Sequence, residues 1–173
     1  LERAALEDPA TLEAEAVAAG VLSAPQVAEA KHKKPAPRRP YISFRALHGS
    51  EIRVGRNARD NDELTFRESN GNDLWLHTAD SPGSHVVLRL ARAGEPDDEE
   101  VLDAAHLALH FSPLRGATKA TIHVARRKEV HKPRKAPAGL VTLSGGKSLH
   151  LRLEAARLER LLRGRGRADE PGA

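Results

Sequence analysis

Apolar and polar residues alternate with a period of two over residues 41–54. The apolar members Ile42, Phe44, Ile52 and Val54 would fall on one face of an extended chain, and a turn that contains glycine separates the first two from the last two. Such alternation is typical of strands with one buried face. The pattern therefore predicts a β-hairpin at the start of the main folded region.

Five further segments have the length and apolar content of strands: 74–78, 85–90, 120–125, 140–143 and 149–153. The first two flank a turn at Pro82-Gly83. Proline fixes a φ angle that suits a turn, and glycine can adopt the positive φ that some turns require. Gly145-Gly146 lies between the last two segments and is a dipeptide favoured in tight hairpins. We therefore predict that 140–143 and 149–153 pair with each other.

Helix signals lie between the strands. Asp60 and Glu63 have the spacing of a capping box, which predicts a short helix that begins there and stops at Asn70-Gly71. The acidic stretch 95–100 precedes residues 101–111, whose apolar positions cover a broad helical face. Negative charge ahead of a helix complements its dipole, so a second helix is predicted at 101–111.

Strands outnumber helices and the connections are of the hairpin kind, which favours an α+β domain with a largely antiparallel sheet and a packed helix. The Ala-rich and Glu-rich N-terminus adds short helices to this prediction. Three prolines among basic residues predict an extended linker after them. The chain thus divides into a helical connector at 1–30, a basic Pro-rich linker at 31–40, the main domain at 41–153, and a C-terminal helix with a disordered tail at 154–173.

Charge is strongly segregated, although the formal net charge is only +4 and the isoelectric point about 9.7. Residues 115–135 hold eight basic side chains against one acid, a net charge of +7, whereas residues 95–103 hold six acids and no base. This asymmetry indicates a polyanionic partner for one face. The chain has no cysteine, no apolar run near the ~20 residues of a membrane helix and no signal layout, so we expect a cytoplasmic protein without a membrane partner.

The segment 126–135, Arg-Arg-Lys-Glu-Val-His-Lys-Pro-Arg-Lys, is the strongest chemical signal that the residues give by themselves. Crowded cations repel one another unless anions screen them, and phosphate oxygens give each a charge-assisted partner with release of counterions. A solvated edge strand protected by its charges would show the same pattern, and the residues alone leave both interpretations open. Aromatic residues are few and, like Trp75, occupy core-like positions, which favours backbone and shape recognition of structured RNA over base stacking.

Histidines suggest a metal site at two places. His77 and His85 bracket the Pro-Gly turn and could approach each other, and Asp103, His106 and His110 share one face of the predicted helix. Neither set has a recognised zinc spacing, and histidines on a polar helix face are commonly hydrated or hydrogen-bonded. We therefore expect no metal and no other cofactor.

An enzyme interpretation would take Ser84 as a nucleophile beside His85. Adjacent residues of a strand point to opposite faces of a sheet, so these two side chains should not form a nucleophile and base pair. No catalytic residue is predicted.

Several irregular polar clusters follow one another in the order Val54-Gly-Arg-Asn-Ala-Arg-Asp-Asn-Asp62, Leu64-Thr65, Asp73-Leu-Trp-Leu-His77, Pro82-Gly-Ser-His-Val86 and a helix ending at Phe111-Ser112. In this order they resemble the NFACT-R domain, the RNA-binding module of the ribosome-rescue factors RqcH and NEMF, over about residues 41–153. The resemblance implies a binding module rather than an enzyme. Its expected partners are tRNA and rRNA on stalled large ribosomal subunits, where full-length relatives extend the nascent chain with C-terminal alanine.

The family's N-terminal domain, helix-hairpin-helix region and coiled coil are not in this sequence, and the chain does not begin with Met. We therefore expect a piece of a longer RqcH-like protein, whose remaining domains would be a further partner. Two other functions stay open: a free-standing binder of DNA or another polyanion, and a small hydrolase or metal enzyme that uses His77 and His85.

The predicted RNA-binding surface combines polar residues of the matched motifs with cations of the basic segment. Its members are Arg56, Asn57, Asn61, Asp62, His77, Ser84, His85, Arg126, Arg127, Lys128, Lys132, Arg134 and Lys135. For Asn57 and Asp62, capping and turn bonding is an alternative explanation of the residue type.

Overall fold

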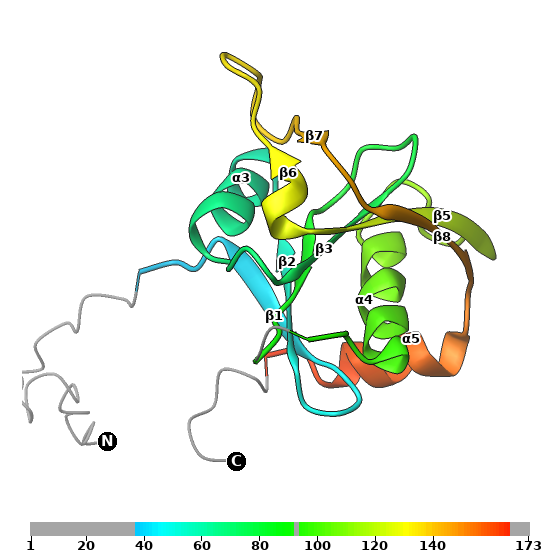
Figure 1. Cartoon of the computed structure of the whole chain (residues 1–173). Coiled ribbons are helices and arrows are strands. Elements are labelled where there is room, and N and C mark those ends of the chain that lie inside the picture. The colour runs from blue at the N-terminus through cyan, green and yellow to red at the C-terminus, as the bar shows by residue number, and fades with distance from the viewer. Residues whose placement is uncertain (1–36, 92–93, 167–173) are drawn as a thin grey trace, which may run out of the picture. The chain divides into compact units, whose positions relative to one another are not determined.

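A six-stranded antiparallel sheet carries the fold, with its strands in the order β1-β2-β4-β3-β5-β8 (Figure 1). The computed structural model describes residues 37–91 and 94–166, so the predicted N-terminal helices, most of the linker and the end of the tail lie outside the described residues. Neighbouring strands of this sheet all run antiparallel, which confirms the predicted α+β class. The strands are β1 Tyr41–Arg45, β2 Glu51–Gly55, β3 Leu74–Thr78, β4 Val86–Leu88, β5 Lys119–Arg126 and β8 Lys147–Arg152.

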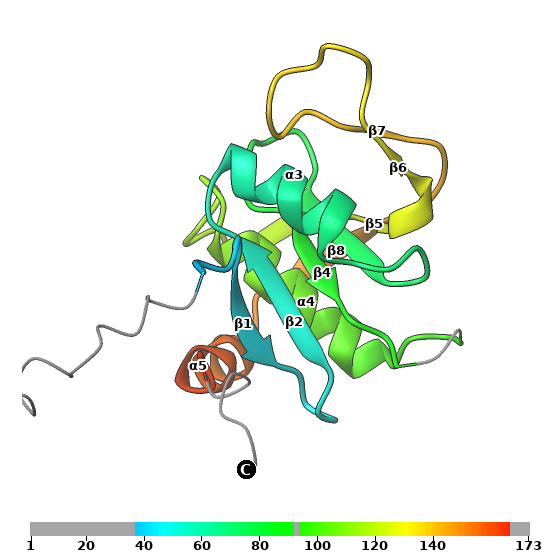
Figure 2. The ribbon, with the colours of Figure 1, turned by 90° about the vertical axis from the view of Figure 1, so that its left-hand side faces the viewer.

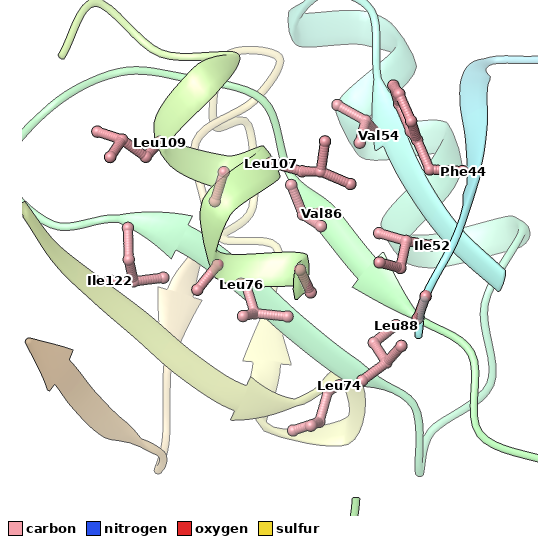
Figure 3. Close-up of a cluster of buried hydrophobic side chains, with 14 of the residues drawn as sticks. Phe44, Ile52, Val54, Leu74, Leu76, Val86, Leu88, Leu107, Leu109 and Ile122 are labelled. Carbon is pink, nitrogen blue, oxygen red and sulfur yellow. The ribbon is translucent and has the colours of Figure 1, made fainter. Parts of the chain in front are cut away.

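The first face of the sheet packs against helix α4 (Asp98–His110) (Figure 3). This helix begins three residues before the predicted start because Asp97 caps it, accepting a hydrogen bond from the Glu99 amide at 2.7 Å. Full burial of each large apolar side chain contributes roughly 1.5–3 kcal/mol, so this core supplies much of the stability. The core contains Phe44, Ile52, Val54, Leu74, Leu76, Val86, Leu88, Leu107, Leu109 and Ile122.

The second face is covered by helix α3 (Ala58–Arg67) and by a small two-stranded sheet of β6 (Val130–His131) and β7 (Thr142–Leu143) (Figure 2). The strand residues that alternate with the first core point to this side. Because both faces are covered, β3 and β4 appear in the sequence as continuous apolar runs. The second core contains Tyr41, Leu64, Trp75, Val87, Ala125 and Val130.

The predicted start of α3 is wrong by several residues. Asn57 is the N-cap, and its side chain accepts a hydrogen bond from the backbone amide of Asp60 at 2.9 Å. Asp60 is instead a buried residue of the first helical turn. The helix also ends at Arg67, before the predicted Asn70-Gly71 stop.

The predicted pairing of 140–143 with 149–153 is also wrong. Strand β7 pairs with β6, and β8 pairs with β5 at the edge of the large sheet. The two glycines between them form a passage from one sheet to the other. Gly146 has a φ of +100°, and a Cβ added there would lie 2.6 Å from the carbonyl oxygen of Val124. Because glycine has no side chain, the backbone can pass close to β5 at this position.

Helix α5 (Ala155–Arg163), predicted at 154–162, packs against α4. The buried carboxylate of Asp103 pairs with Arg157 at 2.8 Å and Arg160 at 2.5 Å. His106 is equally buried, and its Nε2 accepts the backbone amide of Glu154 at 2.9 Å. Asp103 and His106 therefore join two helices. No helix within 37–91 and 94–166 is long and apolar enough to cross a membrane.

Candidate nucleic-acid interface

Trp75, His77 and His85 form a cluster of rings on the second face of the sheet. The His77 ring stacks on Trp75 with 5.6 Å between centroids, while His85 stands edge-on at 5.1 Å from Trp75 and 5.5 Å from His77. The predicted approach of the two imidazoles is thus confirmed. Trp75 is only 2% exposed, and its indole Nε1 has no hydrogen-bond partner among the described residues. The cluster is part of the buried second core, and neither face of Trp75 is open for base stacking.

His85, directly before β4, has a neutral side chain that hydrogen-bonds to α3 and to the loop that contains Gly139. Its Nε2 lies 3.2 Å from the carbonyl oxygen of Gly139, and its Nδ1 lies 2.9 Å from Thr65 Oγ1. A carbonyl can only accept, so Nε2 carries the proton and the Thr65 hydroxyl donates to Nδ1. Burial, with a further contribution from the neighbouring His77, lowers the pKa of His85 to about 4. The pKa of His77 is also lowered, by burial and then by His123.

Asn61 fastens α3 to the residues that precede β4. Its Oδ1 accepts the backbone amide of His85 at 3.0 Å, and its Nδ2 donates to the carbonyl oxygen of Gly83 at 3.3 Å. Gly55 permits this approach, because a Cβ there would lie 2.0 Å from Asn61 Oδ1. The amide groups of Asn61 and of the N-cap Asn57 are thus used in holding the fold, which supports the capping explanation for Asn57.

The loop between β6 and β7, residues 132–141, is here called the basic loop; it rises beyond α3 in Figure 2. Asp62 on α3 accepts the Gly139 amide at 3.0 Å and pairs with Lys132 Nζ at 2.9 Å. Lys132 also donates to the carbonyl oxygens of Pro137 and Leu140 at 2.6 and 3.0 Å. These contacts of Asp62 and Lys132, with the His85 bond to Gly139, are called the latch.

Two arginines of the predicted surface are tied to the protein's own backbone. Arg126 donates to the carbonyl oxygens of Asn72 at 2.7 Å and Gly94 at 3.0 Å. Arg127 donates to the carbonyl oxygen of Thr65 at 2.5 Å, and its guanidinium lies 4.9 Å from the ring centre of Phe66. Like Lys132, these side chains hold structure together.

The remaining cations of the basic segment face outward. Lys128, in the short 3-10 helix Arg127–Glu129, and Arg134 and Lys135, in the basic loop, are exposed, and their side chains have no hydrogen bond or ion pair within the described part of the chain. Arg56 and Arg59 at the start of α3 share both properties. Sequence reasoning missed Arg59, which the spacing Arg56-Asn-Ala-Arg59 around the N-cap could have indicated. Cationic side chains without a partner attract phosphate groups, so these five residues are the candidates for phosphate contact.

An open pocket of about 450 Å³ brings most of the polar motif residues together. Arg56, Asn57, Asn61, His77 and Ser84 line it, with Gly139 of the basic loop completing one side. Asp62 and His85 stand behind this wall through their bonds to Gly139. The pocket does not include Arg126, Arg127, Lys128, Lys132, Arg134 or Lys135.

A second pocket of about 450 Å³ lies between α4 and the β5–β8 edge. Its walls carry the acids Glu95, Asp98 and Glu129 and the bases Arg126 and Lys147 among apolar side chains, so this pocket has no excess of positive charge for a phosphate group. Among residues 37–91 and 94–166, no group of three or more His, Cys, Asp or Glu side chains could hold a metal ion. The buried histidines bind backbone and hydroxyl groups instead.

Fold and site together define an α+β domain in which the buried His85 and the partly buried Asp62 hold a loop that carries exposed cations. This chain belongs to the NFACT protein RNA binding domain family, whose model matches residues 41–145. The match confirms the resemblance seen in the motifs between Val54 and Ser112. It also covers α3, the ring cluster and the complete latch.

Curated relatives point to one group of proteins. The chain is 38% identical over 111 residues to the Rqc2 homolog RqcH of Bacillus subtilis (strain 168), covering 64% of this chain and 19% of that protein. It is 39% identical over 121 residues to the Rqc2 homolog RqcH of Streptococcus suis (strain 05ZYH33), covering 69% and 21%. The chain therefore spans about a fifth of the length of these relatives.

A solved structure has the same fold. The C-terminal part of the fibronectin/fibrinogen-binding protein from Streptococcus suis superposes with a TM-score of 0.66 at 32% sequence identity. The superposition covers 87% of this chain and 58% of that chain.

Proposed function

We propose that this domain binds structured RNA through the five exposed cations Arg56, Arg59, Lys128, Arg134 and Lys135. One observation carries the proposal. The cations of the basic segment and of the start of α3 divide into side chains that bond to the protein and side chains that have no partner among the described residues. The latter lie beside the N-cap of α3, in the 3-10 helix and in the latched basic loop. Membership of an RNA-binding family supports the same ligand.

Recognition rests on the sugar-phosphate backbone and on RNA shape. None of the five aromatic side chains of the chain is exposed, so the domain lacks the stacking platforms of single-strand binders. Double-stranded RNA is read mainly through phosphate and 2′-hydroxyl contacts, which cationic and polar side chains supply. His77 and Ser84, in the pocket beside Arg56, add hydrogen-bonding groups to this surface.

The RNA in the cell, in this proposal, is tRNA or rRNA on stalled large ribosomal subunits in the cytoplasm. Relatives that carry the domain are homologs of Rqc2. Alanine tailing of nascent chains belongs to a full-length protein, and the domain contributes binding without a catalytic step. Its role is to hold one RNA in place while other domains act.

The test compares two triple variants that remove the same charge. Lys128→Gln, Arg134→Gln and Lys135→Gln together remove three of the proposed contacts. The control replaces Arg45, Arg163 and Arg165 with Gln, since these cations are also exposed and lie on β1 or at the end of α5. Figure 2 shows these elements at the opposite end of the ribbon from the basic loop.

Fluorescence anisotropy with a labelled tRNA across a salt series gives the readout. Each phosphate contact contributes about 0.7–0.9 to the slope of log affinity against log salt, so the first variant should lose about 2–3 and the control should match the wild type. A salt-independent affinity, or equal affinities for the two variants, would refute the proposal. Stronger binding of a duplex DNA of the same length would favour a general polyanion binder.

Ribosome co-sedimentation with sequencing of the bound RNA tests the finer part of the proposal. Enrichment of tRNA or large-subunit rRNA over other RNA is expected. Enrichment of neither, with binding in the anisotropy assay intact, would leave RNA binding in place and remove the ribosomal assignment.

A further inference from the structure

Part of the second face of the sheet carries only polar residues. Strands β5 and β8 place three pairs there, in the register Lys119 opposite Arg152, Thr121 opposite His150, and His123 opposite Ser148. The residues that alternate with them, such as Ile122 and Leu151, belong to the first core. The covering by α3 and the β6–β7 sheet is centred on Trp75, Val87 and Ala125. The six polar residues are called the cationic sheet face.

The cationic sheet face is open to solvent. Lys119, Ser148, His150 and Arg152 are exposed, and Thr121 and His123 are partly so. A shallow pocket of about 430 Å³ is lined there by Lys119, Thr121, His150 and Arg152 together with their backbone neighbours. Thr121 Oγ1 lies 3.2 Å from His150 Nδ1, which orients the imidazole beside the two cations.

Two like charges stand directly opposite each other on this face without an acid to relieve them. The side chains of Lys119 and Arg152 have no hydrogen bond or ion pair within residues 37–91 and 94–166, and none of the six residues is acidic. A directly opposed like-charge pair destabilises a sheet. Charge at a sheet edge also discourages pairing with other chains. Lys147 at the start of β8 already serves that purpose, so protection of the edge does not require the opposed pair.

The face is continuous with the interface proposed above. His123 lies directly opposite His77 across β3 and β5, and His77 lines the pocket beside Arg56 and Ser84. Imidazole, hydroxyl and cationic groups therefore run from that pocket to the sheet edge. At roughly 3.3 Å per residue, β5 separates Lys119 from Arg126, next to the 3-10 helix that carries Lys128, by about 23 Å.

We infer that the cationic sheet face is a second binding site for the sugar-phosphate backbone of double-stranded RNA, an inference that rests on the proposed function. Lys119 and Arg152 hold one phosphate group between them, which offsets their mutual repulsion. With Thr121 donating to His150 Nδ1, the Nε2–H of His150 and the Ser148 hydroxyl donate to neighbouring phosphate or 2′-hydroxyl oxygens. The six residues include no Phe, Tyr or Trp, which fits contact with the backbone.

The experiment removes the opposed pair in the whole chain. Lys119→Gln with Arg152→Gln is compared with Arg45→Gln with Arg163→Gln, which removes the same charge from β1, at the other edge of the sheet, and from α5. The probe is an RNA duplex longer than the about 16 base pairs that span two minor grooves. The melting temperature of the first variant should be no lower than that of the wild type, because the repulsion between Lys119 and Arg152 is gone.

Loss of the one shared phosphate contact should lower the salt slope by about 0.9 and the affinity about tenfold in 0.1 M salt, with the control unchanged. Backbone amide resonances of 119–123 and 148–152 should shift when the duplex is added to the wild type. If the affinity of the variant equals that of the control while the basic-loop variant binds poorly, the second site is refuted and the proposed function stands.

Failure of the wild type to bind any RNA would refute both proposals together. A poly-glutamate peptide serves as the remaining probe. If it binds the wild type, loses affinity in the Lys119 and Arg152 variant, and does not compete with RNA, the face is a protein-docking surface and the inference is wrong.

Discussion

Gly139 in the basic loop is joined to Asp62 on α3 by a hydrogen bond of 3.0 Å from the glycine amide to the carboxylate. The same carboxylate pairs with Lys132, which in turn binds two carbonyl oxygens of the loop. One side chain of α3 thus holds the loop that presents Arg134 and Lys135. The position of these cations depends on a residue that has no contact with either of them.

Replacing Asp62 should loosen the loop without unfolding the domain. Asp62→Ala removes both the acceptor of the Gly139 amide and the partner of Lys132, with an expected cost of about 1–3 kcal/mol in the free energy of unfolding. Asp62→Asn keeps an acceptor and should cost less. Urea denaturation measures both, and amide hydrogen exchange at Gly139 should be fastest in the Ala variant. Equal exchange in all three proteins would contradict the latch.

Thr65→Val should destabilise the domain although it nearly preserves side-chain volume. The Thr65 hydroxyl is fully buried and is the partner of His85 Nδ1. Valine leaves this nitrogen buried and unbonded, with an expected loss of about 1–3 kcal/mol. The matched control is Thr142→Val on exposed β7, where a change within about 0.5 kcal/mol is expected. Equal melting temperatures for the two variants would argue against the hydrogen bond.

Stability should fall on mild acidification. The folded protein holds the pKa of His85 at about 4, below its ordinary value of 6.5, so the unfolded chain binds a proton that the folded chain rejects. The contribution is present above about pH 6.5, is lost as the pH falls towards 4, and amounts to at most about 3 kcal/mol. The lowered pKa values of His77 and His106 act in the same direction.

Urea unfolding at several pH values, with an NMR titration of the His85 ring, measures this dependence. His85→Gln should flatten the pH profile between 6.5 and 4, because the variant has no proton to reject at that position. A His85 ring that titrates near 6.5 would show that the contacts to Gly139 and Thr65 do not persist in solution.

Gly55→Ala should be more damaging than a glycine change in an open turn. A Cβ at Gly55 would lie 2.0 Å from Asn61 Oδ1, so the amide that binds His85 and Gly83 must move. A loss of about 1–3 kcal/mol is expected from the overpacking. Gly49→Ala meets no atom within 4 Å and suffers only from its φ of +100°, at a cost of about 1 kcal/mol. The two melting temperatures give the comparison, and the reverse order would contradict the close approach.

Local patterns in the sequence predicted most of the helices and strands but not which distant strands pair with each other. The hairpin of β1 and β2 and the strands on both sides of Pro82-Gly83 follow from alternation and turn residues, which act between near neighbours. The hairpin predicted around Gly145-Gly146 fails because β8 finds its partner in β5, where Leu149 and Leu151 complete the first core. Burial against a remote strand has no signature within 140–153 itself.

The candidate site shows the same division. Motif residues such as Asn57, His77 and Ser84 do gather around one pocket. The sequence could not show which basic residues bond to the protein, because Arg127 finds its acceptor at Thr65 and Lys132 finds its partner at Asp62, far along the chain. At the start of α3, Asn57 and Asp60 are both good caps by local rules. The packing of Asn61 against the turn before β4 favours the earlier start.

The hydrogen bond between Asp62 and Gly139 closes a stretch of 77 positions. Closing a longer stretch costs more chain entropy, and native contacts between distant positions generally form after the local ones have reduced that cost. We therefore expect the latch to form late in folding, after the hairpin of β1 and β2 and after α3. We expect that during synthesis the chain acquires its ordered cationic surface only once the basic loop has left the ribosome, after β1 to β5 have been made.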